Sequence, residues 1–237
     1  MNDPFATTRW SVVLAAGRNL KTDSTSAALE TLCSAYWFPI YSYIRRHVSD
    51  RLAAQDVTQS FFGSILEKGL IGAADPDRGR FRAFLLTACR RFLANEEARA
   101  AAAKRGGRHV TLSLNFEDAE RRYENEPAVD ESPDQHFERQ WANTLLSTVL
   151  QQLRQEYLDR DRAAEFDALK GLLAGTSRPY ADIAAELGRS VGAVKVAVHR
   201  LRERYRELIR SEISQTVDSP ADIDEELQRL YETLTRP

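Results

Sequence analysis

The 237-residue sequence contains only two cysteines, Cys33 and Cys89, and each lies alone within an apolar helical pattern. Because they lack the spacing of metal ligands, we expect buried thiols in a helical core. The four histidines are scattered, with no partner at ligand spacing. We therefore expect no metal site and no cofactor.

Long apolar runs and catalytic signatures are also missing. No segment is apolar enough over a sufficient length to span a membrane, and residues 1–10 lack the basic region and apolar core of a signal peptide. We therefore expect a cytoplasmic protein with no membrane partner. The sequence has no glycine-rich phosphate loop, no HExxH pattern and no nucleophile elbow, so we expect no enzyme.

Strand signals are few, whereas helical periodicity extends along most of the chain, which predicts an all-α fold. The net charge of −2 excludes a globally basic protein, so any attraction for DNA must be local. One acidic segment carries two prolines and too little apolar surface to pack alone, which indicates a flexible linker. We expect two small helical domains at 1–108 and 137–214, the acidic linker at 109–136 and an acidic helical extension at 215–237.

The strongest local pattern is a short helix followed by a longer one within residues 180–210. Tyr180–Leu187 predicts the short helix, Gly188 suits a left-handed cap, and Ser190 suits the N-cap of the next helix. The outward face of the second helix is rich in arginine, which an ordinary solvated bundle helix also tolerates. The glycine turn and the serine cap ahead of the basic run favour a DNA-binding helix-turn-helix.

Three segments, in this order and spacing, resemble the bacterial extracytoplasmic-function sigma factors, which direct RNA polymerase to promoters. Ala53–Phe62 resembles the acidic helix that docks on the polymerase clamp. Asp75–Ala100 resembles the promoter-melting loop and helix, and residues 180–208 resemble the reader of the upstream element. The resemblance covers nearly the whole chain and implies core RNA polymerase and promoter DNA as partners.

The resemblance also implies site residues. DNA contacts are expected from Arg80, Arg82, Phe84, Asn95, Arg99, Lys195, Val196, His199, Arg200 and Arg202. Phe84, beside cations, suits stacking on an unpaired base, but it suits the core equally well. Polymerase contacts are expected from Gln55, Asp56, Gln59 and Phe62.

The docking helix is poor in acid, and this bears on regulation. Periodicity places Leu52, Phe61 and Phe62 on its inner face, while Asp56 is the only charge in its AAQD motif. The resemblance implies control by a Ser/Thr kinase, as in members of the family with acid-poor docking helices, and Thr58 is the expected site, where a phosphate would add negative charge. The alternatives are a plain helical threonine and control by an anti-sigma factor.

Two other function classes remain open at this point. A self-sufficient helix-turn-helix regulator normally dimerises on paired half-sites, but no strong dimer seam is visible. A helical adaptor or anti-sigma-like protein would not need a basic reading helix. The acidic helix expected from Pro220 to Leu234 is predicted either to cover that basic face or to extend the core of the second domain.

Overall fold

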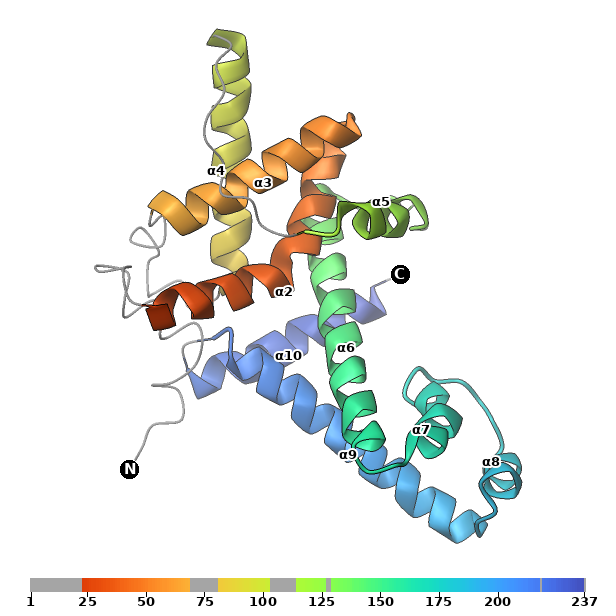
Figure 1. Cartoon of the computed structure of the whole chain (residues 1–237). Helices are drawn as coiled ribbons and strands as arrows, with labels where there is room; N and C mark the ends of the chain where they lie inside the picture. Colours follow the sequence, from red (N-terminus) through yellow and green to blue (C-terminus); the bar gives the residue numbers. More distant parts are fainter. Residues whose placement is uncertain (1–22, 69–80, 103–113, 127–128, 218, 237) are drawn as a thin grey trace. The chain divides into compact units, whose positions relative to one another are not determined.

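A computed structural model describes residues 23–68, 81–102, 114–126, 129–217 and 219–236 (Figure 1). Over these ranges the regular structure is entirely helical, which confirms the all-α prediction. The chain divides into two compact units. The first comprises residues 1–144 together with 213–237, and the second comprises residues 145–212.

The first unit is built around buried aromatic side chains. Its helices are α2 (Asp23–His47), α3 (Arg51–Lys68), α4 (Phe81–Ala102), α5 (Phe116–Glu124), the first part of α6 (Pro133–Leu158) and α10 (Pro220–Thr235). Phe61 contacts Phe62 and Phe92 edge to face, with ring centroids 5.2 and 5.6 Å apart. Each such ring contributes on the order of 2 kcal/mol through burial. Cys33 and Cys89 are buried in this core, as predicted.

Helix α5 corrects the prediction of a wholly flexible linker at 109–136. Phe116–Glu124 are helical, and the Asn115 side chain caps the helix by accepting the N–H of Asp118 at 3.2 Å. The Phe116 ring lies edge to face against Tyr41 of α2, with centroids 5.3 Å apart. The segment therefore packs on the first unit rather than remaining a solvated tether.

A charge pair between a buried carboxylate and a half-buried guanidinium joins α5 to α2. The carboxylate of Glu120 accepts hydrogen bonds from the Arg45 guanidinium, at 2.8 Å for Nη2, and from the Tyr41 hydroxyl. The hydrogen bonds from Arg45 lower the pKa of Glu120, although burial opposes them. Composition suggested a solvated acid, because the cation that neutralises Glu120 lies 75 residues earlier.

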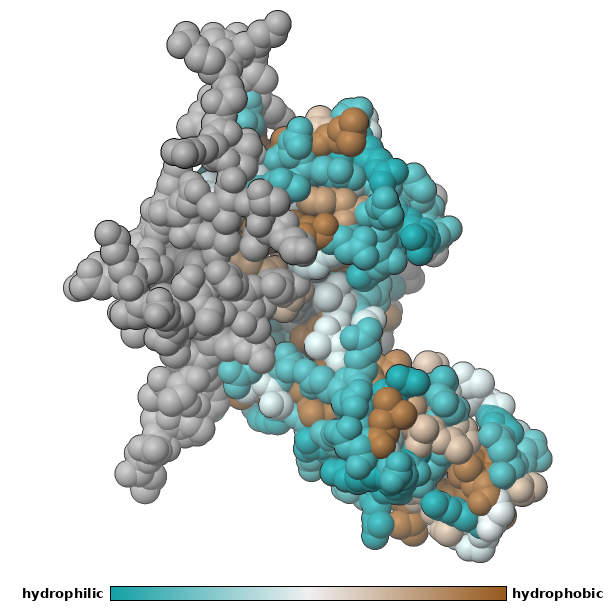
Figure 2. Space-filling model, in the orientation of Figure 1, coloured by the Kyte–Doolittle hydropathy of each residue, from teal (hydrophilic) through white to brown (hydrophobic). Residues whose placement is uncertain are grey.

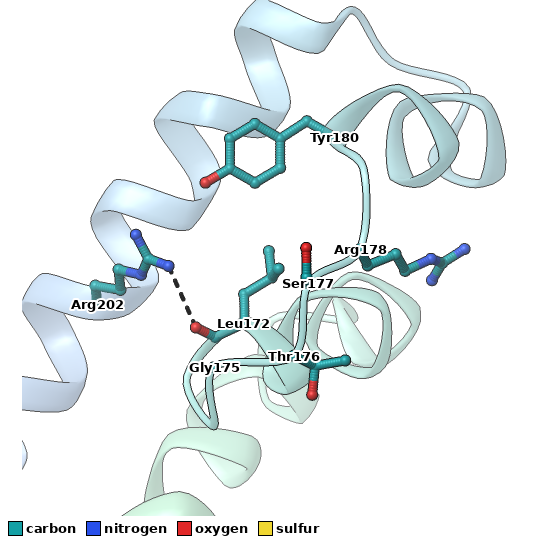
Figure 3. A pocket seen from close by; sticks show the side chains of 7 residues that line it. All are labelled: Leu172, Gly175, Thr176, Ser177, Arg178, Tyr180 and Arg202. Carbon is teal, nitrogen blue, oxygen red and sulfur yellow. Dashed lines mark hydrogen bonds between the residues drawn. The ribbon is translucent and has the colours of Figure 1, made fainter.

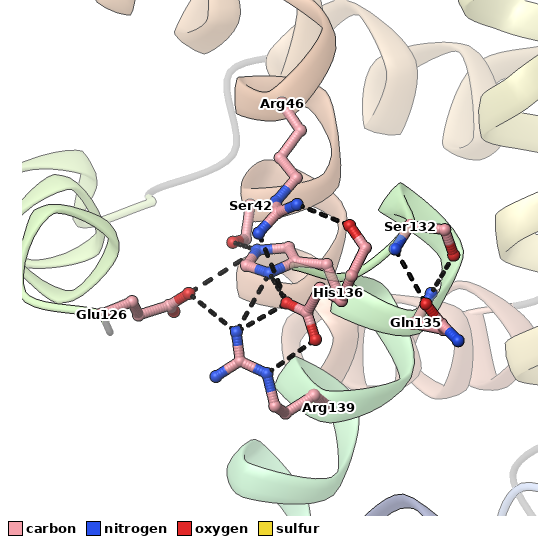
Figure 4. Close-up of polar contacts among 8 residues, drawn as sticks. Ser42, Arg46, Glu126, Ser132, Gln135, His136 and Arg139 are labelled. Atoms are coloured by element: carbon pink, nitrogen blue, oxygen red, sulfur yellow. Dashed lines mark hydrogen bonds and ion pairs between the residues drawn. The ribbon is translucent and has the colours of Figure 1, made fainter. Parts of the chain in front are cut away.

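A second polar cluster joins α2 to the start of α6 (Figure 4). Its centre is the buried ring of His136, whose Nδ1 lies 2.7 Å from a Glu131 oxygen and whose Nε2 lies 2.5 Å from Ser42 Oγ. Glu131 also accepts from Arg139 at 2.7 Å. Burial lowers the pKa of His136 and raises the pKa of the nearby Glu126 to about 7. The cluster thus contains one acid, Glu126, whose charge depends on pH near neutrality.

The C-terminal helix belongs to the first unit, whereas both placements expected from the sequence joined it to the second domain. Helix α10 begins as predicted, with the Ser219 hydroxyl accepting the N–H of Asp222 and with Pro220 in the first turn. Ile223 and Leu230 are buried. Its apolar face therefore completes the core of the first unit.

The second unit contains the last part of α6, then α7 (Ala163–Leu169), η3 (Lys170–Leu172), α8 (Tyr180–Leu187) and most of α9 (Val191–Ser214). Its core side chains are aliphatic or aromatic and come from all of these elements. They include Val149, Leu153, Phe166, Leu169, Leu172, Ile183, Val194, Val198 and Leu201. This small core supports α8 and α9, which form the candidate interface.

Candidate nucleic-acid interface

The turn between α8 and α9 follows from two residues. Gly188 adopts a left-handed conformation, with φ 63° and ψ 36°, and ends α8. Space is not the constraint, because an added Cβ at Gly188 would meet nothing within 4 Å. A side chain would instead strain the backbone. Ser190 Oγ accepts the N–H of Ala193 at 3.2 Å and so caps α9. These features match the expected helix-turn-helix.

Helix α9 has an apolar inner face and a basic outer face. Val194, Ala197, Val198 and Leu201 are buried. The predicted DNA-contacting residues of this helix are all exposed: Lys195, Val196, His199, Arg200 and Arg202. Because the buried positions of α9 are apolar, Lys195 and Arg200 are left on the exposed face, where His199 lies 3.2 Å from Glu203.

Two arginines of the predicted basic run are instead committed to ion pairs within the second unit. Arg204 contacts Glu156 at 2.6 Å and Glu207 at 2.8 Å, and its hydrogen bonds to Glu156 raise its pKa. Arg189 contacts the buried Glu165 at 3.1 Å. These pairs reduce the net positive charge of one side of α9, which the sequence did not indicate.

A pocket adjoins the other side of α9 (Figure 3). It has a volume of about 400 Å³ and is lined by Leu172, Gly175, Thr176, Ser177, Arg178, Tyr180 and Arg202. The Arg202 guanidinium reaches across from α9 and donates to the Leu172 carbonyl at 3.3 Å. Arg178 points away and pairs with Glu186. The pocket therefore presents one guanidinium with hydroxyl groups nearby, a combination that suits a phosphate oxygen.

The predicted DNA-contacting residues of α4 differ in their surroundings. Asn95 is exposed and Phe84 is half-buried, with its ring centroid 6.2 Å from that of Phe81. Arg80 lies outside the described residues, and so does the side chain of Arg99. Arg82 is only 4% exposed, and Glu226 contacts it at 2.9 Å. In this conformation Arg82 is therefore not presented to DNA, which corrects the expectation for that residue.

Helix α3 divides the predicted polymerase contacts between its two faces. Asp56 is exposed, and Gln55 and Gln59 are half-buried. Phe62 is fully buried against Phe61, as its helical position indicated, so it is a core residue rather than a surface contact. These placements leave Asp56 as the most accessible predicted contact on α3.

The outer face of α3 also contains Leu52, which is 68% exposed although periodicity predicted it to face inward. Leu52 stands in the first turn of the helix, where the core no longer covers that face. An exposed leucine beside Asp56 gives the surface an apolar contact that sequence reasoning missed.

The surroundings of Thr58 favour a plain helical threonine over an accessible phosphorylation site. Thr58 is 0% exposed, and its hydroxyl donates to the Ala54 carbonyl at 2.7 Å. A kinase would need this hydroxyl in its active site, and a phosphate would bring roughly −1.5 to −2 charge into the core. Phosphorylation would therefore require α3 to leave its packing.

No helix among the described residues has the length and apolar character needed to cross a membrane. The face drawn in Figure 2 is largely hydrophilic where it is coloured, with scattered hydrophobic residues. Over the same described ranges, His, Cys, Asp and Glu side chains do not gather into a group that could hold a metal ion.

Comparison with models of protein families identifies a family. A model of the ECF sigma factor family matches residues 34–215, well over half of the 237-residue chain. The match includes α3, α4, α8 and α9, and it excludes α10. Searches of curated proteins and of solved structures gave no significant match. The chain therefore belongs to the ECF sigma factors, regulatory proteins that bind RNA polymerase and direct it to promoter DNA for transcription initiation.

Proposed function

We propose that this sigma factor reads the upstream promoter element with the N-terminal half of α9 in the major groove. The exposed cationic face of α9, held by the Gly188 turn, carries this proposal. Lys195, His199 and Arg200 would donate to base edges or phosphates. Val196 is 51% exposed, and it would contact a thymine methyl group. Arg202, beside the pocket, would bind a backbone phosphate.

Helix α4 would capture the downstream element as a single strand. Base stacking needs an aromatic surface with cations beside it. Half-buried Phe84 and exposed Asn95 support this role, and Arg80 and Arg99 are proposed from the family resemblance alone.

Helix α3 would dock on core polymerase through Asp56, Gln55 and Gln59, with Leu52 adding an apolar contact. The exposed positions of Leu52 and Asp56 support this surface. An anti-sigma factor that covers the same face fits the burial of Thr58 better than a Ser/Thr kinase does, because it needs no opening of the core. Because both partners are found there, we expect the protein to act in the cytoplasm.

Run-off transcription with core polymerase over a genomic promoter library tests the proposal. We expect transcripts from a defined set of promoters only when the protein is added. A gel shift distinguishes the proposed sigma factor from a self-sufficient regulator. The sigma factor should bind promoter DNA tightly only with core polymerase present, whereas tight specific binding by the protein alone would contradict the proposed mode.

A further inference from the structure

The first turn of α4 is held by a buried charge network that reaches the end of the chain. Arg82 of α4 and Glu226 of α10 are 4% and 2% exposed, and their nearest charged atoms lie 2.9 Å apart. Glu138 of α6 also pairs with Arg82, whose guanidinium lies over the Trp141 ring at 4.1 Å from its centroid. One side chain thus links α4 to two other helices.

The backbone of the same turn is held by the C-terminal segment as well. The N–H of Phe81, the first residue of α4, donates to the Thr216 carbonyl at 3.2 Å. Phe81 packs edge to face on Tyr36 of α2, with ring centroids 5.2 Å apart. Val217, directly after Thr216, is fully buried. Thr216 therefore holds the backbone of the N-terminal turn of α4, and Glu226 holds the Arg82 side chain in it.

Glu226 matters here because the guanidinium cannot lose its charge to escape burial. Removing one partner of a buried ion pair leaves the other uncompensated, whereas replacing both by apolar groups is often neutral. Burial lowers the pKa of Arg82, while Glu226 acts in the opposite direction. The direction of the Arg82 side chain therefore depends partly on Glu138 and Trp141 of α6 and partly on Glu226 of α10, a helix outside the family match.

We propose that Glu226 is a positioning residue for promoter opening. By holding Arg82, it fixes the N-terminal turn of α4, which begins at Phe81, three residues before Phe84. The inference rests on the proposed single-strand capture by α4. Capture needs its stacking and cationic groups fixed in advance, because a loosely supported site loses binding geometry.

The test compares Glu226→Gln with Glu232→Gln in the full-length holoenzyme. Both variants remove one negative charge from α10, but Glu232 is exposed and bonds only Gln228 at 3.0 Å in the described contacts. The readouts are core-polymerase affinity and the rate of open-complex formation. A fluorescent base analogue in the promoter reports the opening. Opening is measured on a duplex promoter and on one with a pre-melted downstream element.

Glu226→Gln should reduce opening of the duplex promoter roughly tenfold, within the range by which packed networks couple distant groups. Core affinity and transcription from the pre-melted promoter should stay within about twofold of wild type, because core docking is proposed for α3 and pre-melting removes the strand separation that capture by α4 would otherwise have to drive. Glu232→Gln should match wild type throughout. If wild-type holoenzyme opens no promoter, the proposed function fails rather than this inference.

Three results would overturn the proposal. Faster opening by Glu226→Gln would make α10 an inhibitory cover over Arg82, and equal losses on both templates with weaker core binding would make Glu226 only structural. If Glu226→Gln does not fold, Arg82→Met combined with Glu226→Met removes both charges and should fold. That double variant should keep the defect on duplex DNA, and wild-type opening by it would also refute the positioning role.

Discussion

The two basic regions predicted to contact DNA have opposite environments. On α9, Lys195, His199 and Arg200 face solvent because the core beneath them is filled by apolar side chains. On α4, Arg82 is enclosed by Glu226, Glu138 and Trp141. The role of a cation therefore depends on whether an acid from a distant part of the sequence pairs with it, and the local charge pattern does not show this.

The largest difference in stability is expected between substitutions of Arg82 and Arg200. Arg82→Ala should lower the free energy of unfolding by about 3–5 kcal/mol, because Glu226 is left buried without its cation. Arg200→Ala, on the exposed face of α9, should change it by less than about 0.5 kcal/mol. Urea denaturation of the two variants measures the contrast. Equal, small changes would mean that the Arg82 pair is solvated in solution.

Helix α3 extends the same contrast to an uncharged residue. Thr58→Glu should cost roughly 3 kcal/mol of stability, because a carboxylate would enter the core with no cation to pair with. Asp56→Asn, two residues earlier on the exposed face, should be close to neutral for stability and should weaken polymerase binding instead. Thermal denaturation with a core-polymerase binding assay separates the two. A stable Thr58→Glu protein with stronger polymerase binding would restore the phosphorylation hypothesis.

Within α9, Arg200 and Arg204 allow an exposed arginine to be compared with one that is held in an ion pair. Arg200→Ala should cost about 1–3 kcal/mol of promoter discrimination if Arg200 contacts a base. If it contacts a phosphate, the loss should not depend on sequence and the salt slope should fall by about one. Arg204→Ala removes the same charge, but Arg204 is paired with Glu156, so promoter binding should change less. Holoenzyme binding at several salt concentrations distinguishes these outcomes, and equal losses would make the ion pair irrelevant.

The features that sequence predicted well are local ones. Gly188 and Ser190 specify the turn, and Ser219 with Pro220 specify the start of α10, because each acts on backbone within four residues. Helical periodicity also placed Phe62 in the core, against the role that family resemblance suggested for it.

The features that sequence missed depend on pairs far apart. Glu120 meets Arg45 across 75 positions, and Arg82 meets Glu226 across 144. Periodicity assigns a side chain to a face of its helix, but it does not identify what that face packs against. Acids in the linker and the tail therefore looked solvated, although two of them, Glu120 and Glu226, are buried and pair with arginines of α2 and α4.

The smallest expected effect concerns Glu126, a half-buried acid whose contacts with cations are longer than those of its neighbour Glu131. Glu131 takes the short contacts with Arg139 and His136, and although burial opposes them, they lower its pKa. Glu126 lies 3.8 Å from Arg139 and 3.6 Å from His136, and burial raises its pKa to about 7. The two acids of one cluster therefore favour opposite protonation states.

Glu126 should make the protein less stable as pH rises. In the unfolded chain its carboxyl ionises near its ordinary pKa of 4.5, whereas the folded protein holds the proton up to about pH 7. Between these values the folded state binds more protons, so its stability falls with pH, and above them the loss is constant.

Glu126→Gln cannot ionise. It should equal wild type near pH 4 and exceed it by about 1 kcal/mol at pH 8, a value reduced from the full shift by solvent screening. The lowered pKa of His136 acts in both proteins and largely cancels in this difference. Urea denaturation across this pH range is the measurement, with exposed Glu124→Gln as the control. A constant difference between the Glu126→Gln variant and wild type would show that Glu126 is ionised throughout, and that Arg139 is shared between both acids.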